Sequence, residues 1–241
     1  MKFEEIIRTI SSWVAGVAVF LIAAGMYLSA KGFVMGPDGV PVLVKNAQAQ
    51  DNTTEVNKNA ALPQGKILGN PKAPVAIYEF SSYGCFHCAD FHLQVLPEIK
   101  KNYIDKGLVR LVFIPFPLEA KSMQAALVAE CVDNKQYFAF VDLLFKKQRE
   151  WGLSRKSEDI ITQYAALSGL NSQKAETCLH DDAKAREILN RRQQAMENFK
   201  IQGTPAFLIV GKNQREMYYG APSYEDMSAI LNRYLGRDEK K

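Results

Sequence analysis

Two cysteines three positions apart, placed where a predicted strand gives way to a predicted helix, constrain this chain more than any other feature. The motif reads Cys85-Phe86-His87-Cys88, and the apolar run 73–80 before it is typical of a buried strand. A thiol in the first turn of a helix meets free N–H groups and the positive end of the helix dipole, which lower its pKa. The motif therefore predicts a reactive, accessible Cys85 and a buried resolving thiol at Cys88.

The order of the other elements predicts one α/β domain interrupted by a block of helices. A helix over 86–103 leads to a strand at 109–114, which makes the parallel strand–helix–strand unit. Pro97 inside that helix is expected to kink it or remove one hydrogen bond. Further strands are expected at 206–210 and 216–219, before a final helix at 223–235.

The interrupting block spans residues 119–200 and contains amphipathic runs, with Ser157 and Ser172 as the expected N-caps of two of them. Its predicted helices are 121–131, 136–149, 157–168, 172–181 and 183–200.

Residues 10–30 contain no charged side chain and are long enough to cross a membrane. As a helix they would span about 31 Å, close to the hydrocarbon thickness of about 30 Å. Trp13 and Tyr27 lie near the two ends, where aromatic rings prefer the bilayer interface. We expect an N-terminal membrane anchor at 1–30. A cleaved signal peptide is the alternative, although the A-x-A sequence at 47–49 lies far beyond the apolar run.

A polar segment follows the predicted anchor. Residues 31–65 balance three basic against three acidic side chains and are rich in Gly, Pro, Asn and Gln. Such a composition buries little apolar surface, so we expect a flexible tether. The stretch 40–44 (Val-Pro-Val-Leu-Val) is the exception, because it is apolar enough to pair or dock.

Composition and cysteine usage exclude several classes of protein. The net charge of +4 in 241 residues gives no support to nucleic-acid binding, and four cysteines are too few for a disulfide-rich mini-protein. A single C-x-x-C is half of a zinc site, but Cys131 and Cys178 stand alone. We therefore expect no metal and no organic cofactor.

Several segments together resemble the DsbA-type thiol–disulfide oxidoreductases, which are bacterial periplasmic proteins of the thioredoxin fold. The resemblance covers nearly all of 66–237. It is carried by residues 73–88 (with Glu79-Phe80-Ser81-Ser82-Tyr83-Gly84 before the motif), Val95-Leu96-Pro97, residues 107–118 and Gly203-Thr204-Pro205-Ala206-Phe207. Phe86 departs from the family pattern, which usually has proline there. Because the two residues between the cysteines tune the redox potential, this departure bears on the oxidising strength.

The resemblance implies a thioredoxin-like domain formed by 66–118 and 201–237, with the helical domain 119–200 inserted. It implies a cis Thr204-Pro205 bond that packs against the cysteine pair, and a backbone at Thr204 that pairs with an extended substrate. Phe86, Thr204 and Pro205 are thus candidate substrate-binding residues.

Three further side chains are assigned from their positions around the motif. His87, between the cysteines, is expected to stabilise the thiolate and make the couple more oxidising. Glu79, six residues before Cys85, is expected to relay a proton to Cys88, and the family often has a carboxylate at this place. We expect His92, one turn after Cys88, to be a surface or groove residue.

An exported chain with a redox motif lies in an oxidising compartment, and some members of the family have an additional bridge. The resemblance therefore implies a structural disulfide between Cys131 and Cys178, with two free thiols or a second redox pair as alternatives.

The expected function is a periplasm-facing oxidant of the bacterial inner membrane that donates its disulfide to reduced exported proteins. A membrane partner resembling DsbB would reoxidise it. The alternative location is the soluble periplasm after cleavage. The alternative functions are a reductase or isomerase kept reduced by a membrane electron donor, or a metal-binding or chaperone module.

Overall fold

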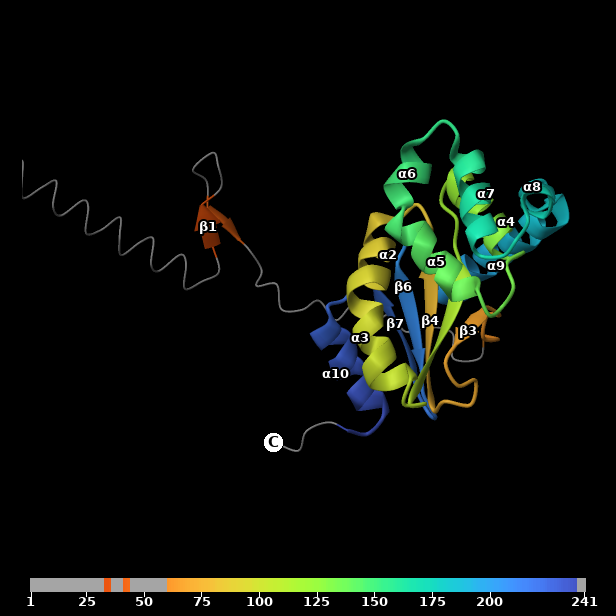
Figure 1. Cartoon of the computed structure of the whole chain (residues 1–241). Helices are drawn as coiled ribbons and strands as arrows, with labels where there is room; N and C mark the ends of the chain where they lie inside the picture. Colours follow the sequence, from red (N-terminus) through yellow and green to blue (C-terminus); the bar gives the residue numbers. More distant parts are fainter. Residues whose placement is uncertain (1–32, 36–40, 44–59, 238–241) are drawn as a thin grey trace, which may run out of the picture. The chain divides into compact units, whose positions relative to one another are not determined.

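The computed structural model describes residues 33–35, 41–43 and 60–237 (Figure 1). The predicted anchor at 10–30 lies outside these residues. Within them, no helix has both the length and the apolar character needed to cross a bilayer. In the predicted tether, β1 (Phe33–Met35) pairs antiparallel with β2 (Pro41–Leu43), so the middle of the apolar stretch pairs locally.

Residues 60–237 fold around a five-stranded sheet with the strand order β3–β5–β4–β6–β7. β4 and β5 are parallel, which confirms the predicted strand–helix–strand unit, and the other neighbours are antiparallel. All of β4 is buried, as expected for a continuous apolar run covered on both faces. The strands are β3 (Lys66–Leu68), β4 (Val75–Ser81), β5 (Val109–Pro115), β6 (Ala206–Val210) and β7 (Arg215–Tyr219).

The helix after the cysteine motif differs from the single α-helix that the sequence predicts. It contains two π-helical turns, η1 and η2, and Pro97 lies in the first turn of α3, directly after η1. The wider π-helical turn before Pro97 accommodates the missing N–H of the proline. A residue at the start of α3 has no α-helical acceptor for its N–H, so no hydrogen bond is lost there. The segments are α2 (Phe86–Asp90), η1 (Phe91–Val95), α3 (Leu96–Ile99) and η2 (Lys100–Ile104).

Two apolar layers cover the sheet. On one face α3 lies beside α10 (Tyr224–Tyr234), as Figure 1 shows, and Met227 and Leu231 pack against sheet residues such as Ile77. On the other face the end of α9 (Asp182–Phe199) supplies Ala195 and Phe199. Both layers are buried, which fixes the register of the central strands.

The inserted helices form a third apolar cluster around Trp151, Phe140 and Ile161. Tyr83 and Cys88 also belong to this cluster, so the cysteine motif lies where the sheet and the insertion meet. Its helices are α4 (Ala120–Ala129), α5 (Tyr137–Lys146), α6 (Gln148–Leu153), α7 (Ser157–Leu167), α8 (Ser172–Leu179) and α9.

Three local expectations for the insertion are wrong. The predicted helix 136–149 breaks at Lys147 into α5 and α6. Asn171 rather than Ser172 caps α8, because its side chain accepts from the Lys174 N–H. Ser157 lies inside α7, one position after the N-cap Lys156.

The folded unit also begins earlier than Lys66. The carbonyl of Ala60 accepts a hydrogen bond of 2.8 Å from the Arg215 guanidinium, and Ala60 packs against the apolar cluster of the α9 face. This contact connects the end of the predicted tether to the edge strand β7.

Candidate active site

Cys85 is the N-cap residue of α2. Its backbone is extended, and its sulfur accepts from the Cys88 N–H at 3.4 Å. The strand β4 ends at Ser81 and the helix begins at Phe86, so the sulfur lies at the positive end of the helix dipole. Cys85 is half-buried and Cys88 is completely buried. The structure thus places one accessible and one covered sulfur, one turn apart.

The two thiols differ widely in proton affinity. A hydrogen bond from the Cys88 thiol is the largest effect on Cys85 and, with the Thr204 side chain and the N–H groups of Cys88 and His87, it outweighs burial and lowers the pKa of Cys85 to about 6. Burial is the largest effect on Cys88 and raises its pKa far above the ordinary value. Near neutral pH the reduced pair therefore holds one thiolate and one thiol.

This asymmetry predicts a pH-dependent difference in stability between the two redox forms. The Cys85 pKa is lowered on folding, so its contribution is present above the unfolded pKa of about 8.5 and is lost as the pH falls through about 6. We expect the unfolding free energy of the reduced form to rise relative to the oxidised form between these values. Thiolate absorbance and denaturation of both forms would measure it, with Cys85→Ala as the control. A midpoint near 8.5 would contradict the prediction.

Thr204 faces the pair from the loop before β6, and Pro205 follows it in the chain. Their peptide bond is cis. The Cys85 thiol donates to the Thr204 carbonyl at 3.3 Å, and the buried Thr204 hydroxyl has no hydrogen-bond partner among the residues that the structure describes. That hydroxyl is therefore available to donate to the thiolate. In this redox state the Thr204 carbonyl is directed at Cys85, and its pairing with a substrate stays a prediction.

A buried ion pair joins β4 to the helix that follows the cysteine motif. The His92 Nε2 lies 3.0 Å from both carboxylate oxygens of Glu79, and both side chains are fully buried. Asp142 on α5 approaches the other ring nitrogen at 3.6 Å. Burial alone would lower the pKa of His92, but the charge of Glu79 and the contact with Asp142 outweigh it and raise the pKa to about 9. The expectation that His92 lies on the surface is wrong.

The loop before the motif is held by two polar residues of the insertion that the sequence analysis missed. The Gln148 amide donates to the carbonyls of Tyr83 at 2.7 Å and Cys85 at 2.9 Å. The Ser122 hydroxyl accepts from the Gly84 N–H at 3.1 Å and bonds the Ser82 hydroxyl at 2.7 Å. Both residues are buried, so these bonds are shielded from water.

A close approach limits the space at Gly84. A Cβ at this position would lie 2.3 Å from Oε1 of Glu119, the N-cap residue of α4. The carboxylate thus packs directly against the backbone that precedes Cys85.

The two residues between the cysteines are exposed. The His87 side chain is 77% exposed and lies 3.9 Å from the Asp90 carboxylate, while its backbone N–H contributes to the lowered pKa of Cys85. The functional effect expected of its imidazole stays a prediction. Phe86 is 55% exposed, and the Arg149 guanidinium lies 5.8 Å from its ring centre. The ring is thus available next to Cys85.

Comparisons with known proteins agree with this geometry. The family model described as thioredoxin matches residues 61–233. The chain belongs to the thioredoxin family. A putative protein-disulfide oxidoreductase of Rickettsia prowazekii is 29% identical over 176 residues, which are 73% of this chain and 63% of the relative. The chain therefore spans less than two thirds of that relative's length.

Solved structures and a second relative place the chain among the DsbA-type members of this family. The crystal structure of Wolbachia pipientis alpha-DsbA1 superposes with a TM-score of 0.67 at 29% identity, covering 73% of this chain and 94% of that one. Disulfide bond formation protein D of Bacillus subtilis is 36% identical over 114 residues, which are 42% of this chain and 51% of that protein.

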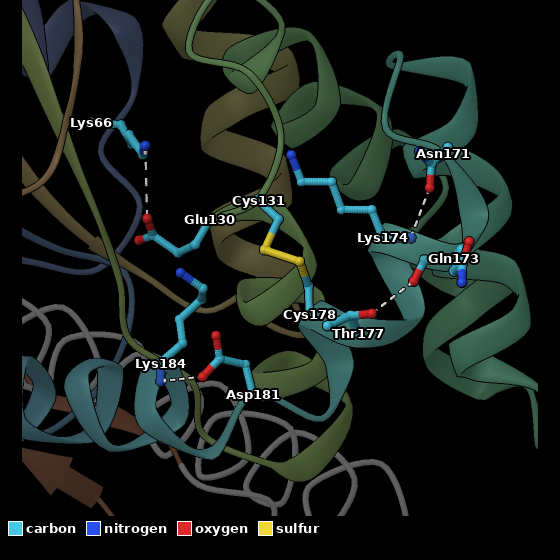
Figure 2. The surroundings of a disulfide bond; sticks show 10 residues. All are labelled: Lys66, Glu130, Cys131, Asn171, Gln173, Lys174, Thr177, Cys178, Asp181 and Lys184. Carbon is cyan, nitrogen blue, oxygen red and sulfur yellow. Dashed lines mark hydrogen bonds and ion pairs between the residues drawn. A yellow bond between two sulfur atoms is a disulfide. The ribbon is translucent and has the colours of Figure 1, made fainter.

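A disulfide joins Cys131, just after α4, to Cys178 in α8 (Figure 2). The bridge closes a loop of 47 residues between two inserted helices. Beside it, Glu130 forms ion pairs with Lys66 of β3 at 3.8 Å and with Arg191 of α9 at 2.9 Å. The bridge and these ion pairs thus lie together where α4, α8, α9 and the sheet edge meet.

A pocket of about 520 Å³ opens beside the cis bond. Its wall includes Lys200, residues 202–205, Tyr219 and Gly220. Lys200 has a left-handed backbone (φ 56°) at the C-terminus of α9, and the Tyr219 hydroxyl donates to the Phe199 carbonyl at 3.2 Å. The Tyr219 hydroxyl thus holds the wall of the pocket where β7 meets the end of α9.

Proposed function

We propose that this DsbA-type protein is a thiol–disulfide oxidant that passes the Cys85–Cys88 disulfide to reduced exported proteins. One observation carries the proposal: Cys85 lies at a helix N-terminus as a stabilised thiolate, with its covered partner one turn away. This is the arrangement that a leaving thiolate needs in exchange.

The reaction balances as two exchanges. A substrate thiolate attacks Cys85 Sγ, the Cys85–Cys88 bond breaks, and Cys88 leaves and takes up a proton. A second substrate thiolate then attacks the substrate sulfur of the mixed disulfide and releases the Cys85 thiolate. The substrate gains one disulfide and the protein ends as one thiolate and one thiol.

The direction follows from which form the protein stabilises. Contacts that hold Cys85 as an anion stabilise the reduced pair, so the disulfide is a better oxidant than an ordinary one. Glu79 is buried and its charge helps to raise the Cys88 pKa, so we assign it as the acid–base group for Cys88. His87, which lies between the two cysteines, is assigned to stabilise the thiolate and so to make the couple more oxidising.

Substrate recognition is assigned to the surface next to Cys85. Phe86 offers an exposed ring, and Thr204 and Pro205 border the pocket. An extended segment that carries a cysteine would lie along this edge with its sulfur toward Cys85.

The cellular setting is part of the same proposal. The apolar run at 10–30 supports a single-pass anchor in the bacterial inner membrane, with the catalytic domain in the periplasm. A DsbB-like membrane protein would then reoxidise the pair. A soluble periplasmic form after cleavage is the alternative.

The equilibrium of the Cys85–Cys88 couple with glutathione tests the proposal. We expect a potential nearer to the about −120 mV of DsbA than to the about −270 mV of thioredoxin. Quantifying both forms by thiol alkylation across glutathione buffers measures it, with a Cys88→Ala variant as the control that cannot form the disulfide. A value near that of thioredoxin would instead favour the reductase or isomerase.

A further inference from the structure

The Glu79–His92 ion pair is buried, and His92 follows Cys88 by four positions on the same helix. A carboxylate in a fully buried site is held ionised only by a nearby cation or by several hydrogen-bond donors. Among residues 60–237, His92 is the cation that pairs with Glu79. The Glu79 charge in turn acts on Cys88, whose pKa it helps to raise.

We propose that His92, four positions after Cys88 on the same helix, is a positioning residue for thiol–disulfide exchange: its imidazolium holds the Glu79 carboxylate ionised, so that Glu79 accepts the Cys88 proton. This inference rests on the proposed function, because it assigns a part in the step in which Cys88 reacts.

The surroundings of the ring keep it in place. The His92 ring lies 4.4 Å from the Phe145 ring and meets the Phe113 ring edge-on at 5.4 Å. Asp142 adds a second negative charge from the insertion. With carboxylates at both nitrogens, the imidazole stays protonated in the pH range of exchange, in line with its pKa of about 9.

Other titratable groups interact electrostatically with this pair. Burial is the main reason why the pKa values of the Tyr83 and Tyr137 hydroxyls are raised, and the charge of Glu79 raises them further. Both tyrosine hydroxyls therefore remain neutral when Cys88 reacts. The titratable groups around the pair are Asp142 on α5, Cys88 on α2, and Tyr83 and Tyr137.

The role is clearest in oxidation of the reduced protein by oxidised glutathione. The Cys85 thiolate attacks the glutathione disulfide, forms a mixed disulfide and releases one glutathione thiolate. Cys88 then gives its proton to Glu79 and attacks Cys85 Sγ, and the second glutathione leaves as a thiolate. Only this second step needs the ionised carboxylate.

The test separates the two steps by rapid quenching and mass analysis across pH. In His92→Gln the buried carboxylate loses its counter-ion and takes up a proton. We expect the second step to slow at least about tenfold near pH 7 and its pH profile to move upward, while the first step stays within about twofold. His180→Gln is the matched control, because His180 pairs with Glu176 at 3.2 Å on the exposed end of α8.

A double variant makes the test independent of the folding of the single one. Glu79→Gln with His92→Gln leaves a neutral pair, and its second step should be as slow as in Glu79→Gln alone. Equal slowing of both steps in His92→Gln would overturn the proposal, as would a wild-type second step in either variant or a double variant slower than Glu79→Gln. Failure of the first step in the unmodified protein would instead refute the proposed function.

Discussion

Replacing Cys85 with alanine is expected to reduce thiol oxidation and insulin reduction to their rates without protein. Cys85 is the sulfur that is both accessible and stabilised as a thiolate, whereas Cys88 is buried with a strongly raised pKa. No covalent exchange can then begin, because the thiolate is the attacking and leaving group. Turnover with a fluorescent dithiol peptide would measure the loss.

The matched control is Cys88→Ala. This variant keeps the nucleophile but cannot resolve the mixed disulfide, so it should accumulate a covalent adduct at Cys85 that mass spectrometry detects. Persistent exchange in Cys85→Ala, or an adduct at another sulfur, would place the nucleophile elsewhere.

Removing the second disulfide is expected to lower stability without removing chemistry. The Cys131–Cys178 bridge closes a loop of 47 residues, and its loss in a Cys131→Ala/Cys178→Ala variant should cost about 4 kcal/mol of unfolding free energy, by the chain-entropy model. Denaturant unfolding of oxidised protein would measure this, and a Cys131→Ser/Cys178→Ser variant checks that the alanine side chains are not the cause.

The site should tolerate this change because Ser122, which contacts the redox loop, lies near the opposite end of α4 from Cys131. A loss below about 1 kcal/mol would show that the unfolded chain gains little freedom without the bridge. A simultaneous loss of exchange would show that the bridge also supports the redox site.

The features that sequence patterns could predict are those set by neighbouring residues. The strand before Cys85, the helix after it and the parallel partner at β5 follow from local apolar periodicity and appear within a few residues of their expected bounds. The π-helical turns were missed, because Pro97 offers no signal that distinguishes a kink from a widened turn.

The features that escaped prediction depend on partners far apart in the sequence. His92 carries a polar side chain on a helix, which alone favours the surface, and its partner Asp142 lies 50 positions later in an inserted helix. Gln148 and Ser122 are ordinary polar residues of amphipathic helices. Nothing in their own segments indicates that they point inward at the carbonyls and the amide of the redox loop. Capping also escaped where Asn171 and Ser172 are adjacent and both can cap.

The hold of Gln148 and Ser122 on the loop before Cys85 has a consequence for protein engineering. The tetrapeptide Cys-Phe-His-Cys cannot be transferred on its own. If it were grafted onto a scaffold that lacks these helices, the peptide groups next to it would lose the hydrogen-bond donors and acceptors that fix their conformation. Chimeras between this protein and smaller relatives should therefore exchange the loop together with α4 and α6.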